Sequence, residues 1–378
     1  MENVNTQRRR PAPKKRRGKA VIRILLRSLL VLFTVIIMAV VGLYMVCDLI
    51  FNGPSESARD VLTMSMLESS GMKWFPAIFI GQEKVDEIQN SVSVTLPNDV
   101  SGSDQVVINP GNQLTSKEWE GHPDGIRIEY VYGDTYNAYV MLIRDPSAVY
   151  MATSSETFST SIPGERIHLQ IEKEGALAAI NAGAFYDNGT SSSVVGSVPE
   201  GLVIADGKVV WSSGKAPEEG FVDFNKDNIM VVAKTMTADR AMELNIRDGC
   251  CFGPVLIMDG TVNEEAYNSN SGWNPRTAIG QRADGTVIFL CIDGRQAGSL
   301  GGSYADIIDI MVEFGAVNAC NLDGGSSTVM LYKDTQGLYS DDIKHWGNDI
   351  AMINNYSLLQ KEPRRMPTFF MVRPGSED

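Results

Sequence analysis

Apolar and polar residues alternate along much of the chain beyond residue 125, and a period of two predicts strands. Residues 126–146 alternate and are rich in β-branched and aromatic residues, which predicts a hairpin or two strands. Asp206-Gly207 separates two apolar runs and is a strong signal for a hairpin turn. Strands or hairpins are expected at 126–146, 176–181, 201–211, 221–232, 254–263 and 277–294, and on both sides of Asp323-Gly324-Gly325.

Helical patterns are fewer in this part of the chain. Residues 163–175 predict a helix that ends at Gly175, and residues 303–314 predict another. Ser303 and Asp306 have the spacing of a capping box, and Gly315 suits the position after the last turn. The buried face of this helix is predicted to hold Ile307, Ile308, Met311, Val312 and Phe314. Many strands, few helices and no strict alternation of the two favour an α+β fold with a strand-rich mixed sheet.

The N-terminal region has a different pattern. Residues 28–47 carry no charge over a length that crosses a bilayer as a helix. Arg23 and Arg27 precede this run, which predicts a cytoplasmic N-terminus and an extracellular body. We therefore expect a single-pass protein of the cell membrane. A cleaved signal peptide is the alternative, although its apolar run is shorter and ends at a small-x-small site.

These patterns divide the chain into four parts. Residues 1–27 form a basic cytoplasmic tail, and residues 28–47 form the transmembrane helix. Residues 48–125 form an extracellular stalk and linker, with helices expected at 55–72 and near 82–89 and a Ser-, Asn- and Pro-rich stretch from 90. Residues 126–378 are expected to form the large folded domain, and the motifs that bear on its function lie within it.

The charge and the cysteine pattern limit which partners and metal sites the protein is expected to have. The net charge is −13 although the first 30 residues are strongly basic, so the body is acidic and nucleic acid is excluded as its partner. Of the cysteines, the adjacent Cys250 and Cys251 are candidates for a bridge, whereas Cys291 and Cys320 fit buried apolar positions. No zinc-type C-x-x-C repeat occurs and there are only three His, which argues against a His-rich metal site. The sequence sets no oligomeric state.

Polar residues gather where four apolar strands begin or end, at 181–187, 274–278, 293–295 and 321–327. Asp-Gly after a strand is more often a turn than a catalytic group, but four such places together favour a shared site. In 321–327, a carboxylate is followed by two glycines and two serines. Glycine permits a sharp turn and the close approach of a ligand, and hydroxyl and backbone N–H groups hold anions. The pattern predicts a site for a sugar or a phosphate.

The same segments carry a resemblance to a known family. NAGAFYD, FGPVLIMDG, NPRTAIG, DGR and NACNLDGGSSTVML resemble, in order and spacing, the phosphodiester glycosidase family over about residues 126–373. The resemblance implies a hydrolase that cleaves a sugar-1-phosphodiester, such as an α-N-acetylglucosamine-1-phosphodiester, at the C1–O bond, in exopolysaccharide or cell-wall metabolism. Ala184 departs from the family, which more often has an aromatic pair after the glycine, and this alters one wall of the site.

That reaction suggests roles for the candidate residues. The leaving phosphomonoester has a second pKa of about 6 and departs as an anion, so it needs a cationic clamp more than a strong acid. Arg276 and Arg295 are assigned to the phosphate. Asp323 is expected to be the base or nucleophile, with Asp293 as its partner. The other predicted substrate-binding residues are Asn181, Thr277, Asn321, Gly324, Gly325, Ser326 and Ser327.

Several alternatives stay open at this stage. Tyr186 and Trp273 are candidates either for stacking on a sugar or for core packing. No cofactor is required, but a divalent cation held by Asp293 and Asp323 would make the protein a phosphodiesterase that breaks the P–O bond. A non-catalytic glycan-binding module is the third possibility. The residues Asp223-x-Asn225-x-Asp227 resemble the start of a calcium loop, but Asn228 and Lys234 stand where that loop needs Gly and Glu, so a hairpin turn is expected.

Overall fold

The computed structural model describes residues 16–375 apart from 68, 70, 91–97, 103, 105, 109–116, 187–195, 215–219, 335–344, 347–348 and 356–361. The chain divides into two compact units, Met1–Arg59 and Asp60–Asp378. Much of the predicted linker, and Asp187 of the first polar segment, lie outside the described residues.

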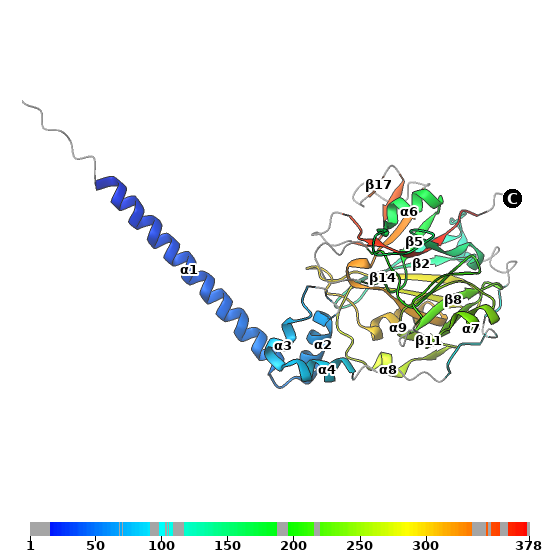
Figure 1. Cartoon of the computed structure of the whole chain (residues 1–378), viewed down its shortest axis with the longest axis horizontal. Coiled ribbons are helices and arrows are strands. Elements are labelled where there is room, and N and C mark those ends of the chain that lie inside the picture. The colour runs from blue at the N-terminus through cyan, green and yellow to red at the C-terminus, as the bar shows by residue number, and fades with distance from the viewer. Residues whose placement is uncertain are drawn as a thin grey trace, which may run out of the picture. The chain divides into compact units, whose positions relative to one another are not determined.

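The first unit is dominated by one long helix, α1 (Arg16–Phe51) (Figure 1). Its stretch Arg23–Phe51 is long and apolar enough to cross a membrane, and it is the one such helix among the described residues. Apolar side chains along it are exposed, as Leu29 and Met38 illustrate. The helix extends beyond the predicted span at 28–47 at both ends, and on the N-terminal side the flanking Arg and Lys residues are good helix formers. α2 (Glu56–Leu67) and α4 (Gln82–Asn90) confirm the two helices expected in the stalk, and α3 (Phe75–Ile80) lies between them in the chain.

The second unit is built around a seven-stranded sheet. Neighbouring strands of this sheet run antiparallel to one another. In spatial order its strands are β1 (Ile126–Tyr132), β2 (Asn137–Ile143), β14 (Val287–Ile292), β13 (Arg276–Arg282), β15 (Ala316–Leu322), β11 (Val255–Met258) and β12 (Thr261–Val262).

Further sheets complete this unit. The six-stranded sheet has the order β17 (His345–Trp346), β18 (Ile350–Met352), β16 (Met330–Lys333), β5 (Ala178–Asn181), β20 (Thr368–Val372) and β3 (Val149–Thr153). The five-stranded sheet has the order β7 (Lys208–Ser212), β6 (Leu202–Ala205), β10 (Ile246–Cys251), β8 (Phe221–Asn225) and β9 (Met230–Ala233). β4 (Glu165–Arg166) pairs with β19 (Arg365–Met366). Besides α3 and α4, the short α-helices in the described part of this unit are α6 (Ile167–Glu174), α7 (Ala238–Glu243) and α8 (Glu264–Tyr267).

Alternating side chains place two cores on the two faces of the large sheet. Along β2, Met141 and Ile143 join the core that is shared with the other sheets. Val140 and Leu142 point to the opposite face and pack with α9 (Tyr304–Glu313). Helices α6 and α9 thus lie on opposite sides of the strand layers (Figure 1). Each fully buried aliphatic side chain in these cores contributes about 1.5–3 kcal/mol to the stability of the fold. The arrangement of strand layers with helices packed on them confirms the α+β prediction.

The two predicted helices of this unit form with small differences. α9 begins with the expected capping box at Ser303, and Gly315 follows it with φ of 81°. Val312 is exposed, so its predicted burial is wrong; the apolar stripe is centred between Ile307 and Met311, and Ile310 fills its edge instead. α6 begins four residues later than predicted because Glu165–Arg166 pairs as a strand, and it ends at Gly175 as expected.

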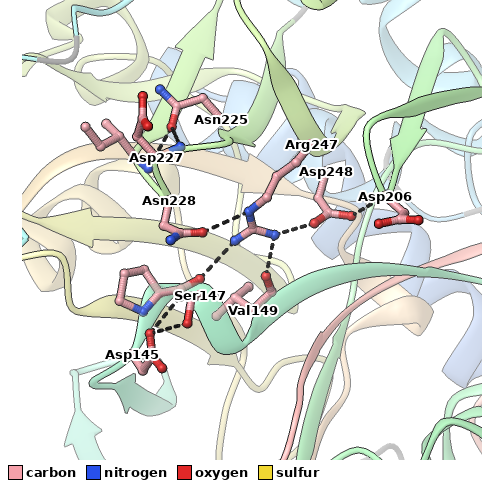
Figure 2. A network of polar contacts seen from close by, with 11 residues as sticks. Asp145, Ser147, Val149, Asp206, Asn225, Asp227, Asn228, Arg247 and Asp248 are labelled. Carbon is pink, nitrogen blue, oxygen red and sulfur yellow. Dashed lines mark hydrogen bonds and ion pairs between the residues drawn. The ribbon is translucent and has the colours of Figure 1, made fainter.

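An arginine ties the strands of two sheets together (Figure 2). Arg247 on β10 donates to the Asn228 Oδ1 atom at 3.1 Å and to the backbone oxygens of Val149 and Pro146 at 2.8 and 3.0 Å, and it pairs with Asp248. The neighbouring calcium-loop-like residues form the expected hairpin turn. Asn225 caps that turn by accepting from the backbone N–H groups of residues 227 and 229.

The cysteines of the body are all buried and free. Cys291 and Cys320 lie in the central core, as predicted. The bridge considered for Cys250 and Cys251 is absent, because neighbouring residues of a strand point to opposite faces and these two belong to different cores.

Candidate functional site

The four polar segments predicted from the sequence lie together. β13 runs antiparallel to both of its neighbours, so its first residue lies beside the last residues of β14 and β15. Hydrogen bonds join the segments: Asp323 N–H donates to the Ala182 oxygen at 3.1 Å and Gly325 N–H to the Pro275 oxygen at 2.8 Å. The Arg295 Nη2 atom donates to Asn274 Oδ1 at 2.9 Å. The fold thus converts separate strand ends into one cluster.

Asn181 is the buried centre of this cluster. Its Nδ2 atom donates to the Asp323 backbone oxygen at 2.5 Å. Its Oδ1 atom accepts from Thr277 Oγ1 at 2.9 Å and from the Val329 N–H at 3.2 Å. Asn181 and Thr277 are both fully buried, so they support the backbone around Asp323 from the interior of the protein.

The turn after Asp323 requires its two glycines. A Cβ atom on Gly324 would lie 2.7 Å from the Pro275 oxygen, well inside van der Waals contact. Gly325 has φ of 60° and begins the short helix η3 (Gly325–Ser327). A Cβ atom there would lie 3.3 Å from the Arg295 Nη1 atom. The glycines therefore allow the turn to pack against Pro275 on one side and the guanidinium group on the other.

Arg276 lies beneath the accessible surface. Its guanidinium group donates to the backbone oxygens of Gly302, Ser271 and Gly272 at 3.1, 2.7 and 3.1 Å. The same group lies over the Tyr304 ring, 4.5 Å from its centroid. Arg276 is 3% exposed, so these contacts make it a support of the 271–272 loop.

Two other arginines reach the turn from the accessible side. Arg295 is exposed; it donates to Asn274, and its guanidinium group lies where it would meet a side chain at position 325. Arg364 is half-buried; its Nη1 atom donates to Ser326 Oγ at 3.3 Å, and its guanidinium group lies 4.8 Å from the Phe185 ring centroid. Sequence reasoning missed Arg364 because it follows no strand end. It reaches the site through β20, which follows it in the chain and pairs with β5.

Asp293 is held by a set of donors. Tyr139 donates its hydroxyl to Asp293 Oδ2 at 2.9 Å, the Asn355 N–H donates to the same atom at 3.1 Å, and Asn354 Nδ2 donates to Oδ1 at 3.3 Å. Burial raises the pKa of Asp293 to about 6, and these hydrogen bonds oppose the rise. Asn354 also donates to the Thr328 oxygen at 3.3 Å, which links Asp293 to the segment that follows Ser327. Tyr139 and Asn354 were not predicted as part of the site.

The remaining candidates divide by accessibility. Asn321 and Ser327 are buried; Asn321 Nδ2 donates to the Gly253 oxygen at 2.8 Å. Asp323, Gly324, Gly325 and Ser326 are half-buried. Tyr186 and Trp273 are 56% and 43% exposed, so neither packs in the core. The accessible part of the cluster therefore combines one carboxylate, a hydroxyl and two guanidinium groups, with the Phe185 ring beside Arg364. What each residue does to a substrate stays a prediction.

Comparison with known proteins identifies the chain's family. Residues 174–373, more than half of the chain, match the family described as phosphodiester glycosidase (NAGPA). The chain belongs to this family. The resemblance carried by the sequence motifs is confirmed, and because a phosphodiester glycosidase is a hydrolase, the broad class of the predicted activity follows from the family.

Individual relatives agree with the family match. The chain is 26% identical over 238 residues to the SPbeta prophage-derived uncharacterized protein YomE of Bacillus subtilis (strain 168), covering 61% of this chain and 34% of that protein. It therefore spans about a third of this curated relative. The catalytic domain of zebrafish N-acetylglucosamine-1-phosphodiester alpha-N-acetylglucosaminidase, auto-inhibited by its pro-peptide, has a similar fold. The TM-score is 0.50 at 20% identity, over 66% of this chain and 82% of that one.

Proposed function

We propose that the protein is a membrane-anchored hydrolase that cleaves a sugar-1-phosphodiester at the C1–O bond outside the cell. The observation that carries the proposal is the turn after Asp323, where Arg364 donates to Ser326 and the Arg295 guanidinium group lies beside Gly325. Family membership supports the reaction class.

The chemistry follows from the positions of these groups. In one route, water attacks C1 of the sugar, Asp323 accepts its proton, and the phosphate leaves with the electron pair of the broken C1–O bond. In the other route, Asp323 attacks C1 and displaces the phosphate, and water then hydrolyses the glycosyl-enzyme ester at C1, releasing the sugar, the carboxylate and a proton. Arg295 and Arg364 compensate the negative charge that develops on the leaving phosphate. Arg364 takes the role that the sequence suggested for Arg276, because Arg276 already donates to backbone oxygens.

Asp293 serves this site as a positioning residue in our proposal. It is 2% exposed, and its oxygens accept from Tyr139, Asn354 and Asn355. A carboxylate with these partners holds the loop around Asn354 in place, and Asn354 in turn contacts the Thr328 oxygen. Asp323, which is half-buried, is the better placed of the two carboxylates for contact with a substrate.

The membrane location is part of the proposal. Arg23 and Arg27 precede the uncharged run, which favours a cytoplasmic N-terminus. An extracellular body would act on phosphodiester-linked sugars of exopolysaccharide or cell-wall material. Protease treatment of intact cells tests this: the body should be removed while the N-terminal tail stays protected.

Kinetics of site variants test the reaction. With the methyl phosphodiester of α-N-acetylglucosamine as substrate, Asp323→Asn should lower kcat at least a thousandfold. Asp227→Asn, an exposed carboxylate on the β8–β9 hairpin, is the matched control and should retain full activity. Arg364→Ala should lower kcat/KM by more than a hundredfold, because a charged partner of the leaving group is lost. Equal activities of Asp323→Asn and Asp227→Asn would refute the assignment.

A further inference from the structure

Two large aromatic side chains stand exposed on the edge strand β1. Tyr130 is 44% exposed and Tyr132 is 75% exposed. Residues two apart on a strand share one face, so these rings lie on the same side of the sheet. Ile126 and Ile128 share that face and pack into the central core, so the tyrosines continue the face beyond the point where the core ends.

This face leads directly to the candidate site. Tyr130 is paired across the strands with Tyr139, and Tyr132 is paired with Asn137. The rings of Tyr130 and Tyr139 meet edge to face, with centroids 5.5 Å apart. Tyr139 donates to Asp293 at 2.9 Å and accepts from Asn355 Nδ2 at 3.2 Å. Contacts therefore run from Asp293 through Tyr139 to the Tyr130 ring, and Tyr132 follows on the same face of the strand.

The chemistry of this row suits a carbohydrate. A pyranose ring has an apolar face of C–H groups that packs on an aromatic ring, and hydroxyls around its edge that need hydrogen-bond partners. Tyrosine offers both an apolar ring and a polar tip. Asn137 and Asn355 add amide groups beside the rings, and none of these side chains carries a positive charge. The surface is thus suited to neutral sugar residues and not to a second phosphate.

We propose that Tyr130 and Tyr132 form a subsite for neutral sugar residues of the substrate that lie away from the phosphodiester being cleaved. This inference rests on the proposed function and narrows its substrate class: the preferred substrate is an oligosaccharide or polymer that carries the phosphodiester. The phosphate binds near Arg295 and Arg364, and the further sugars extend along β1.

Substrates of two lengths test the subsite. The short probe is the methyl phosphodiester of α-N-acetylglucosamine. The long probes carry three further β-1,4-linked N-acetylglucosamine residues, either on the reacting sugar or on the phosphate side. The full-length protein should show a higher kcat/KM for one long probe than for the short one. Tyr132→Ala should lower kcat/KM for that probe about threefold to tenfold and leave the short probe unchanged.

Matched variants separate the ring from other effects. Tyr132→Phe keeps the ring and should retain most of the preference for the long probe. Tyr267→Ala removes an exposed tyrosine from α8, which packs with α9 on the opposite face of the large sheet. It should leave kcat/KM unchanged for both the short and the long probe. Equal kcat/KM values for short and long probes in the unmodified protein, or equal losses on both in Tyr132→Ala, would overturn the proposal.

A binding measurement distinguishes this inference from the proposed function. If the protein hydrolyses no probe, the proposed function fails, and calorimetric titration of the unmodified protein with chitotetraose decides on the subsite alone. Binding that Tyr132→Ala weakens and Tyr267→Ala does not supports the subsite. No binding, or equal binding by both variants, overturns it.

Discussion

Replacement of Asn181 by alanine tests the account of how Asp323 is held. The side chain is fully buried and makes three hydrogen bonds, to the Asp323 oxygen, the Thr277 hydroxyl and the Val329 N–H. Its removal leaves three polar groups without this hydrogen-bond partner, and each lost partner lowers the free energy of unfolding by about 1–3 kcal/mol. Because the neighbours relax together, we expect Asn181→Ala to lower the free energy of unfolding by about 3–5 kcal/mol.

The assay is urea unfolding of the full-length protein in detergent, followed by tryptophan fluorescence. Thr277→Val is the matched variant: it removes one donor and nearly preserves shape, so its cost should be about 1 kcal/mol. Under conditions where both variants are folded, kcat should fall about a hundredfold in Asn181→Ala, since Asp323 loses its support. A loss of stability below 1 kcal/mol in Asn181→Ala, or equal losses in the two variants, would refute the reasoning.

Three further predictions concern the same unit. Gly324→Ala should lower stability by about 1–3 kcal/mol and reduce activity in thermal melts and kinetic assays, because its Cβ would lie 2.7 Å from the Pro275 oxygen. The folded state raises the pKa of Asp293 to about 6. The contribution of this group to the free energy of unfolding is therefore complete below its unfolded pKa, near 4, and decreases by about 3 kcal/mol as the pH rises to 6. Asp293→Asn should flatten that part of the plot of stability against pH. Burial raises the pKa of Asp223 well above its usual range, and among the described residues neither of its carboxyl oxygens has a hydrogen-bond partner. Asp223→Asn should therefore raise the melting temperature more at pH 8 than at pH 5, and an equal change at both pH values would contradict this.

Local signals in the sequence predict much of this fold. The capping box at Ser303, the glycine after α9 and the Asp206-Gly207 turn all act through nearby backbone groups, so they can be recognised from a few residues. The polar residues at strand ends likewise mark the site, because antiparallel pairing brings those ends together.

The roles of the arginines depend on distant contacts and could not be predicted in this way. Arg276 is held in a buried position by contacts such as its hydrogen bond from Nε–H to the oxygen of Gly302, which is 26 residues away in the sequence. Arg364 reaches Ser326 only because the strand that follows it pairs with β5. The exposed Tyr130 and Tyr132 fit an ordinary strand pattern, and only the contact with Tyr139 connects them to the site.

Determining which bond is broken tests the central claim most directly. The full-length protein is incubated in ¹⁸O-labelled water with the methyl phosphodiester of α-N-acetylglucosamine, and both products are examined by mass spectrometry. Exchange of label at the free sugar is corrected with a control of unlabelled sugar under the same conditions. Our account predicts one ¹⁸O atom in the released sugar and none in the methyl phosphate. Label in the methyl phosphate would show attack at phosphorus and contradict the account.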